Sequence, residues 1–310
     1  MTTRLPIALA AATVLSGCAA QVAPPQSAAT EMTPSVDAAA SDGMRWLYGS
    51  GEAAGASIQA WRMLADYTVA VSRQRKVPQS VPMGLPDATG GIGTPSCINA
   101  DGTIKTFAAV FDVDETVILN LGYEYWQAMG HAYNSAEWAD WAANGAPYVA
   151  PVPGAVTGLK RLREAGITVV FNTNRKSDSA AGTAAAIVAA GLGPAKHGET
   201  LFLNGDDSMG SRKDGRRATI ASRYCVIALA GDNLGDFADV FNTSDMEPQQ
   251  RRQLAVRGEY AQLWGNGWFA LPNPVYGDSI KGSVGDVFPP DSRWQPGAPG
   301  GAPPIMNEDK

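Results

Sequence analysis

Residues 106–120 read TFAAVFDVDETVILN, a short apolar run that leads directly into Asp112 and a series of polar residues. An apolar run of this length is typical of a strand that is buried on both faces. Similar runs recur at residues 167–172, 201–204 and 225–230. Between the runs lie stretches with helical spacing, at residues 154–165, 180–190 and 216–223. Strands that alternate with helices predict an α/β fold in which helices flank a parallel sheet.

Chemically active side chains accompany these apolar runs. They are Asp112 and Asp114 after the first run, Thr173 after the second, Lys213 before the last, and Asp232 and Asp236 after it. In an open parallel sheet, ligands bind beyond the carboxyl ends of the strands, so we expect these side chains to meet at one sheet edge. Carboxylates, a hydroxyl and a lysine in one place are what phosphoryl transfer through an aspartyl-phosphate requires.

The order of the residues predicts a role for each. Asp112 would be the nucleophile, and Asp114 would protonate the leaving oxygen and later accept a proton from the attacking water. Thr173 and Lys213 would bind the phosphoryl oxygens and stabilise the charge of the transition state. We interpret Arg175 as a structural ion-pair partner outside the catalytic set.

A magnesium ion is expected beside these groups. Mg²⁺ prefers oxygen ligands and would neutralise the repulsion between a carboxylate nucleophile and an anionic phosphate. Asp232 would hold the ion, and Asp236 would orient either the metal ligands or Lys213.

The motifs resemble, in order, those of the haloacid dehalogenase (HAD) superfamily, and most closely the bacterial class C acid phosphatases, the lipoprotein nucleotidase group. The matching blocks are Asp112–Asn120, Thr173–Lys176, Ser211–Arg216 and Gly231–Phe237, and the resemblance covers about residues 44–245. It implies a HAD-like Rossmannoid sheet and Mg²⁺ bound by the side chains of Asp112 and Asp232 and by the main-chain carbonyl of Asp114. It also implies hydrolysis of small phosphomonoesters, often nucleoside monophosphates, outside the cytoplasm.

The rest of the chain divides by composition. Residues 41–105 combine helical spacing at 44–75 with a connection rich in Pro and Gly, and 106–285 form the expected catalytic core. The segment 117–152 interrupts the alternation of strands and helices, so we expect it to form a small helical cap together with the N-terminal helix. Residues 286–310 are a Pro- and Gly-rich tail.

The inserted segment is rich in aromatic residues. Tyr123 and Trp126 lie close to the first motif in sequence, and we expect them to stack on a nucleobase or an aromatic leaving group. Trp138 and Trp141 are three residues apart, which places them on one helix face and favours a role in the core.

The N-terminus has the pattern of an export signal. Residues 1–17 have a basic start and a short apolar core, and the junction before Cys18 resembles a bacterial lipobox. We therefore expect lipidation at Cys18, a disordered tether over residues 18–40, and an outer-membrane lipoprotein in a bacterial cell envelope. With 24 Lys+Arg and 30 Asp+Glu the net charge is −6, which argues against a nucleic acid polymer as partner.

The other two cysteines allow two interpretations. In an oxidising compartment Cys97 and Cys225 could form a disulfide. Alternatively, Cys225 is simply a small buried residue of an apolar strand. The sequence leaves both possibilities open.

Together the motifs and the resemblance predict a Mg²⁺-dependent, extracytoplasmic acid phosphatase that forms an aspartyl-phosphate, and the resemblance adds 5′-nucleotidase activity as a narrower expectation. The alternative is a surface lipoprotein that binds a ligand on a HAD fold without turnover, because a fold does not fix a function.

Overall fold

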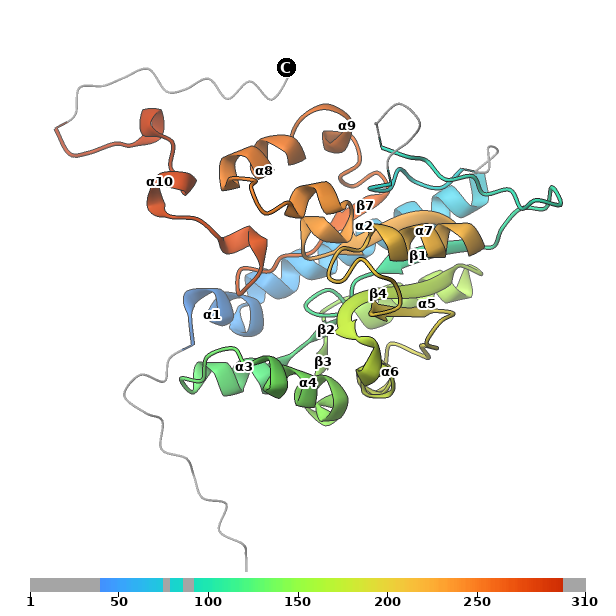
Figure 1. Ribbon diagram of the computed structural model, residues 1–310, viewed down its shortest axis with the longest axis horizontal. Helices are drawn as coiled ribbons and strands as arrows, with labels where there is room; N and C mark the ends of the chain where they lie inside the picture. Colours follow the sequence, from blue (N-terminus) through green and yellow to red (C-terminus); the bar gives the residue numbers. More distant parts are fainter. Residues whose placement is uncertain (1–39, 75–78, 86–91, 298–310) are drawn as a thin grey trace, which may run out of the picture. The chain divides into compact units, whose positions relative to one another are not determined.

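A five-stranded parallel sheet forms the centre of the fold (Figure 1). The computed structural model describes residues 40–74, 79–85 and 92–297. The strands, in the spatial order β5-β4-β1-β6-β7, are Leu201–Asn204, Thr168–Lys176, Phe107–Phe111, Cys225–Gly231 and Trp268–Ala270. The chain runs outward from β1 to β4 and β5 and then returns to the other side of β1 for β6 and β7. The strand order therefore reverses at β1, and a ligand site is expected at its carboxyl end.

The strands predicted from the apolar runs are present, and the structure adds three that the sequence did not indicate. These are β7 and a short antiparallel pair, β2 (Ile118–Leu119) with β3 (Ala150–Pro151). Two or three residues are too few to show a periodic pattern, so such strands are not visible in a sequence. The α/β class with a parallel sheet is confirmed.

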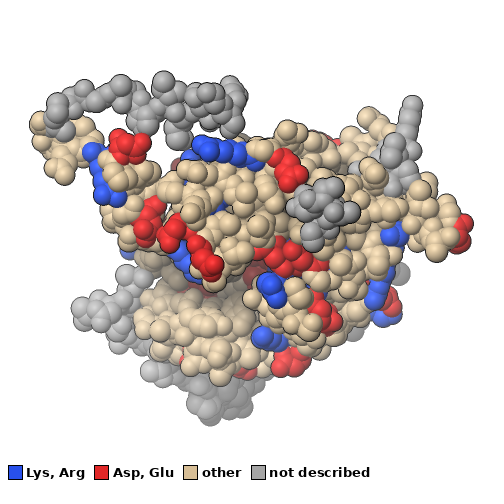
Figure 2. All heavy atoms as spheres, turned by 45° about the horizontal axis from the view of Figure 1, so that its top comes forward, with Lys and Arg blue, Asp and Glu red and all other residues tan. Residues whose placement is uncertain are grey.

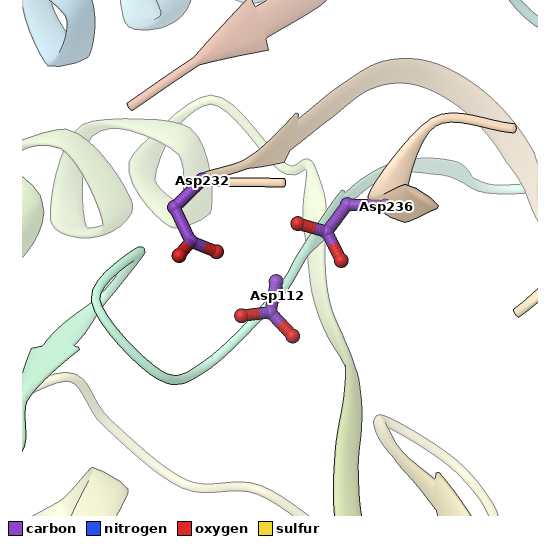
Figure 3. A group of neighbouring side chains, drawn as sticks. All are labelled: Asp112, Asp232 and Asp236. Atoms are coloured by element: carbon purple, nitrogen blue, oxygen red, sulfur yellow. The ribbon is translucent and has the colours of Figure 1, made fainter. Parts of the chain in front are cut away.

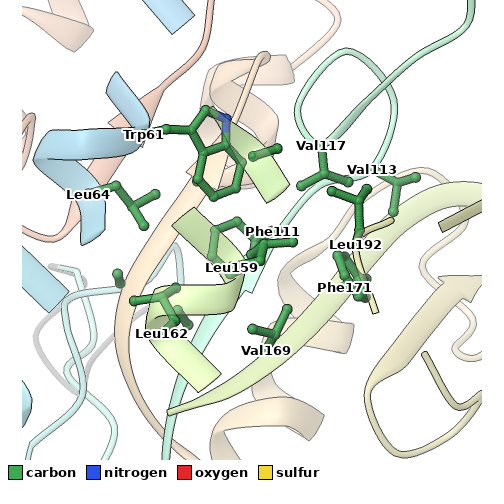
Figure 4. Close-up of a cluster of buried hydrophobic side chains, with 14 of the residues drawn as sticks. Trp61, Leu64, Phe111, Val113, Val117, Leu159, Leu162, Val169, Phe171 and Leu192 are labelled. Carbon is green, nitrogen blue, oxygen red and sulfur yellow. The ribbon is translucent and has the colours of Figure 1, made fainter. Parts of the chain in front are cut away.

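Helices cover both faces of the sheet. One face packs against α2 (Gly51–Gln74), α5 (Ala155–Glu164) and α6 (Ala180–Ala189), and the other packs against α7 (Asp214–Arg223). Figure 4 shows the first of these interfaces, where the indole of Trp61 stacks on Phe111 with ring centroids 5.3 Å apart. The alternation along β1 matches this arrangement, because Phe111 belongs to this core and Val110 to the core on the opposite face.

The N-terminal helical segment differs from its predicted role as a cap. It begins with α1 (Asp42–Gly49), breaks at Ser50 and continues as α2, whose apolar stripe lies in the core against the sheet. Because that stripe is buried, α2 belongs to the helix layer that covers one face of the sheet. Helix α1, in contrast, contacts the first motif, since the hydroxyl of Tyr48 donates to Glu115.

The inserted segment forms most of the cap. It contains α3 (Leu121–Ala128), α4 (Ser135–Asn144) and the short helix η1 (Ala146–Tyr148), enclosed by the β2-β3 pair. Helix α4 packs so closely on α6 that a Cβ atom at Gly182 would lie only 2.3 Å from the carbonyl oxygen of Ala143. Short helices make up much of the remainder: η2 (Ser177–Ser179), η3 (Leu234–Asp236), η4 (Asp239–Asn242), α8 (Pro248–Ala255), α9 (Gly258–Ala261), η5 (Asp278–Ile280), α10 (Val284–Val287) and η6 (Pro290–Ser292).

The two alternatives for the cysteines are resolved. Cys97 and Cys225 form a disulfide with their Cα atoms 4.6 Å apart, and both residues are fully buried. The bond ties the segment before β1 to the first residue of β6.

Several predictions fall outside the described residues. These include the signal segment 1–17, lipidation at Cys18, all of the tether except residue 40, and the tail from residue 298. Among the residues that the structure describes, no helix is both long enough and apolar enough to span a bilayer.

The contact between α2 and the sheet should contribute strongly to stability. We expect Trp61→Ala to lower the free energy of unfolding by about 3–5 kcal/mol, because it leaves a cavity against Phe111. Met63→Ala on the same helix is the control: its side chain is 51% exposed, so we expect a loss of less than about 1 kcal/mol. Urea unfolding followed by circular dichroism measures both, and equal losses in the two variants would contradict the assignment.

Candidate active site

The first motif turns sharply at the end of β1. The amide of Asp112 still pairs with Ala230 of β6 at 2.9 Å, and the chain then bends so that the amides of Val117 and Ile118 both donate to the carbonyl of Val113. Glu115 adopts a positive φ of 53°, which an L residue rarely adopts. This turn keeps Asp112 and Thr116 on the same side, where the Thr116 hydroxyl lies 3.5 Å from Oδ2 of Asp112.

Three carboxylates converge at this edge of the sheet. Asp112 follows β1, Asp232 follows β6, and Asp236 lies in η3; one oxygen from each lies within 4.8 Å of the others. Figure 3 shows the three carboxyl groups near one another at this edge of the sheet. Burial, which Lys213 partly offsets, raises the pKa of Asp112 to about 7. Burial, together with Asp236 and Asp112, raises the pKa of Asp232 well above its usual range.

This donor set fits a hard divalent cation. The cluster offers only oxygen ligands, which Mg²⁺ prefers, and a cation there would offset the repulsion between buried negative charges.

A buried lysine bridges two of these carboxylates. The ammonium of Lys213 donates to Oδ1 of Asp112, to Oδ1 of Asp236 at 2.6 Å, and to the main-chain oxygen of Asn172 at 2.8 Å. Burial alone would lower the pKa of Lys213, but Asp112 and Asp236 raise it, so the group stays charged.

The sequence analysis missed Asp239. Its carboxylate accepts hydrogen bonds from the amides of Lys213 and Asp214 and so fixes the start of α7.

The second aspartate of the motif has a different environment. Asp114 forms an ion pair with Arg175, whose Nη2 lies 2.8 Å from Oδ1 and whose side chain is 1% exposed. Asn120 donates to the same oxygen at 3.0 Å. The hydroxyl of Thr173 lies 3.5 Å from Oδ2 of Asp114 and accepts from the amide of Arg175. Arg175 is thus an ion-pair partner, as predicted, but its partner is the proposed acid itself.

Glu115 connects the motif to distant segments. Its buried carboxylate accepts from Tyr48 of α1 at 3.1 Å, from the amide of Asn120 at 2.9 Å, and from the hydroxyl of Tyr276. Sequence patterns alone offered no independent argument for this role.

Asn273 is a further residue that the sequence missed. Its amide nitrogen donates to Oδ2 of Asp232 at 2.6 Å, and its amide oxygen accepts from the backbone of Val275 and Tyr276. It follows β7, and because that strand was not predicted, its carboxyl end was not searched for polar residues.

A cleft of about 630 Å³ opens above these groups. Aromatic side chains line it, namely Tyr123, Tyr133, Trp138 and Tyr276. Figure 2 shows one face of the molecule, on which acidic and basic side chains lie close together around a hollow.

The aromatic predictions have mixed outcomes. Tyr123 does line the cleft, but its ring is 5% exposed and meets Trp138 edge to face. Trp126 is not among the described residues that line it, because its ring stacks on His131 and its nitrogen donates to Glu137. Trp138, predicted for the core, lines the cleft beneath the Arg175 guanidinium.

Comparison with known proteins shows that the chain is similar to acid phosphatases. Residues 96–279 match the family model described as HAD superfamily, subfamily IIIB (Acid phosphatase). Two solved structures of a class C acid phosphatase from Bacillus anthracis are similar in fold, each with a TM-score of 0.58. The structure with tungstate bound is 22% identical and the other 23%; the matches cover 78% of this chain and 90% and 89% of those chains.

Asn273 should matter for cation binding, since it holds a carboxylate of the cluster. We expect Asn273→Ala to weaken Mg²⁺ binding by about 10-fold or more, because residues that orient metal ligands typically change affinity by this amount. Isothermal titration of the metal-free protein with Mg²⁺ measures it. The control is Asn266→Ala, an exposed asparagine whose side-chain amide donates to the backbone carbonyl of Gln262. Equal affinities in the two variants would argue against the role of Asn273.

Proposed function

The chain belongs to the HAD superfamily, subfamily IIIB of acid phosphatases, and on this premise we propose that it hydrolyses phosphomonoesters through a phosphoryl group carried on Asp112. Family membership makes the protein a phosphomonoesterase. The observation that carries the covalent mechanism is the position of Asp112, which is buried at the end of β1 with Lys213, Asp232 and Asp236 around it.

In the first step, a carboxylate oxygen of Asp112 attacks phosphorus and the bond between phosphorus and the leaving oxygen breaks. Asp114 gives its proton to that oxygen, so that the product leaves as a neutral alcohol. Lys213 and Thr173 bind the phosphoryl oxygens, on which negative charge accumulates in the transition state.

In the second step, water attacks phosphorus and the bond to Asp112 breaks. Asp114, now ionised, takes the proton of the water, and inorganic phosphate leaves. The ion pair with Arg175 supports this part of the proposal, because it holds the carboxylate of Asp114 in a fixed orientation beside Thr173.

The proposal includes a magnesium ion. The carboxylates of Asp112 and Asp232 and the main-chain carbonyl of Asp114 would hold it, with Asp236 and Asn273 orienting the groups around it. When bound, Mg²⁺ neutralises part of the charge on the phosphate.

The proposed substrates are small phosphomonoesters such as nucleoside monophosphates, and the aromatic lining of the cleft supports a ring-bearing leaving group. We further propose export as a lipoprotein anchored at Cys18, with the catalytic part outside the cytoplasm. The disulfide between Cys97 and Cys225 supports an oxidising compartment. Against the alternative of a binding lipoprotein without turnover, the proposal is supported by the presence of Asp112, Asp114, Thr173 and Lys213 in the chain.

Removal of the nucleophile tests the covalent step. We expect Asp112→Asn to lower phosphate release from p-nitrophenyl phosphate by at least about 1,000-fold, because an amide cannot attack phosphorus. Acid quenching during turnover should trap a phosphorylated protein for the wild type and none for the variant. Asp140→Asn, an exposed aspartate on α4, is the matched control and should retain wild-type turnover. Turnover of Asp112→Asn within 10-fold of wild type would refute the mechanism.

Metal removal gives a second test. We expect EDTA to abolish phosphate release from p-nitrophenyl phosphate and AMP, and Mg²⁺ in excess to restore it, because the carboxylate cluster alone repels an anionic substrate. Undiminished turnover after chelation and dialysis would contradict the proposed metal site.

A further inference from the structure

Glu124 is an acidic residue of the cleft that the mechanism does not use. It lies on α3, lines the cleft and is 4% exposed. Its Oε2 atom is fully buried and has no hydrogen-bond partner among the residues that the structure describes. A buried carboxyl oxygen without a partner is costly, so such an atom in a binding cleft points to a ligand that supplies the missing hydrogen bond.

The other acidic side chains of the cleft are all accounted for. Asp114 pairs with Arg175, Asp239 with Arg217 and Asp278 with Lys281. The remaining three, Asp112, Asp232 and Asp236, form the carboxylate cluster. Within the described part of the chain, Glu124 has neither a basic partner nor a place in that cluster.

The position of Glu124 relates it to the leaving group. The phosphoryl group is expected between Asp112, Thr173 and Lys213, whereas Glu124 belongs to the cap. Asp114 is the proposed proton donor to the leaving oxygen, and it interacts electrostatically with Glu124. Burial, and after it the negative charge of Asp114, raises the pKa of Glu124 to about 7. The aromatic ring of Tyr133, also in the inserted segment, lines the same cleft.

We propose that Glu124 is a specificity-determining residue that binds an ammonium group on the leaving alcohol, so that the enzyme favours aminoalkyl phosphates over neutral alkyl phosphates. This inference rests on the proposed function, since it assigns a subsite to the leaving group of that reaction. An ammonium group supplies both the hydrogen-bond donors and the positive charge that the carboxylate lacks, and aromatic faces attract cations. With a neutral leaving group, Oε2 of Glu124 stays unpaired in the enzyme–substrate complex. We therefore expect a lower kcat/KM for that substrate than for one that carries an ammonium group.

The test compares two substrates of nearly equal size, 2-aminoethyl phosphate and 2-hydroxyethyl phosphate. We measure kcat and KM for phosphate release with Mg²⁺ at pH 7.5, where the alkylammonium is protonated. For the wild type we expect kcat/KM to be about 10-fold higher for the amine. In Glu124→Gln, which keeps the size of the side chain, this ratio should fall to about 1–2, mainly through a higher KM for the amine.

The control is Glu164→Gln, an exposed glutamate on α5 whose contact is an ion pair with Lys160. It removes the same charge from the surface and should leave the ratio of the two substrates unchanged. As a second measurement on the wild type alone, ethylammonium should inhibit hydrolysis of 2-hydroxyethyl phosphate competitively, whereas ethanol should not.

The failure of this inference is distinguishable from that of the proposed function. Equal kcat/KM values for the two substrates in the wild type, or an unchanged ratio in Glu124→Gln, would overturn the subsite while phosphate release continues. No release from either substrate or from p-nitrophenyl phosphate, by folded protein with Mg²⁺, would overturn the phosphatase proposal and the subsite with it.

Discussion

The bridge that Lys213 forms between two buried carboxylates connects the parts of the site. Its ammonium joins Asp112 after β1, Asp236 in η3 and the backbone of Asn172 in β4. Because the lysine is 3% exposed, each charge depends on the others, and removal of one partner would leave an uncompensated charge in the interior. Asp239 holds the start of α7, which carries Lys213 to this position. The geometry of the carboxylate cluster therefore depends on how α7 packs on the sheet.

A second set of contacts joins the site to the segments that shape the cleft. Glu115 binds α1 through Tyr48, the start of α3 through Asn120, and the segment after β7 through Tyr276. The same turn carries the nucleophile, so the position of the cap is linked directly to the reacting groups. The substrate must therefore fit between the phosphoryl site at the sheet edge and cap residues such as Glu124. In this arrangement the cap residues contact the leaving group, whereas the residues at the sheet edge carry out the reaction.

Some features of the site were hidden from the sequence for identifiable reasons. Asn273 follows a strand of only three residues, and a run that short has no periodicity. Trp126 and Trp138 both lie on helices near the first motif, and helical spacing does not say what a helix face meets. Helix α4 packs on α6 at Gly182, and Trp138 of α4 lines the cleft, whereas the ring of Trp126 stacks on His131.

The sequence by itself determined the parallel α/β class, strands β1, β4, β5 and β6, and the convergence of Asp112, Thr173 and Asp232 at one sheet edge. Local apolar patterns and the rule that ligands bind beyond the carboxyl ends of parallel strands are enough for this. Only the tertiary structure decided that Arg175 pairs with the second aspartate of the motif, that Cys97 bonds to its partner cysteine, and that α2 covers the sheet instead of the cleft. Periodicity describes the geometry of neighbouring residues, whereas partners from distant segments depend on how whole elements pack.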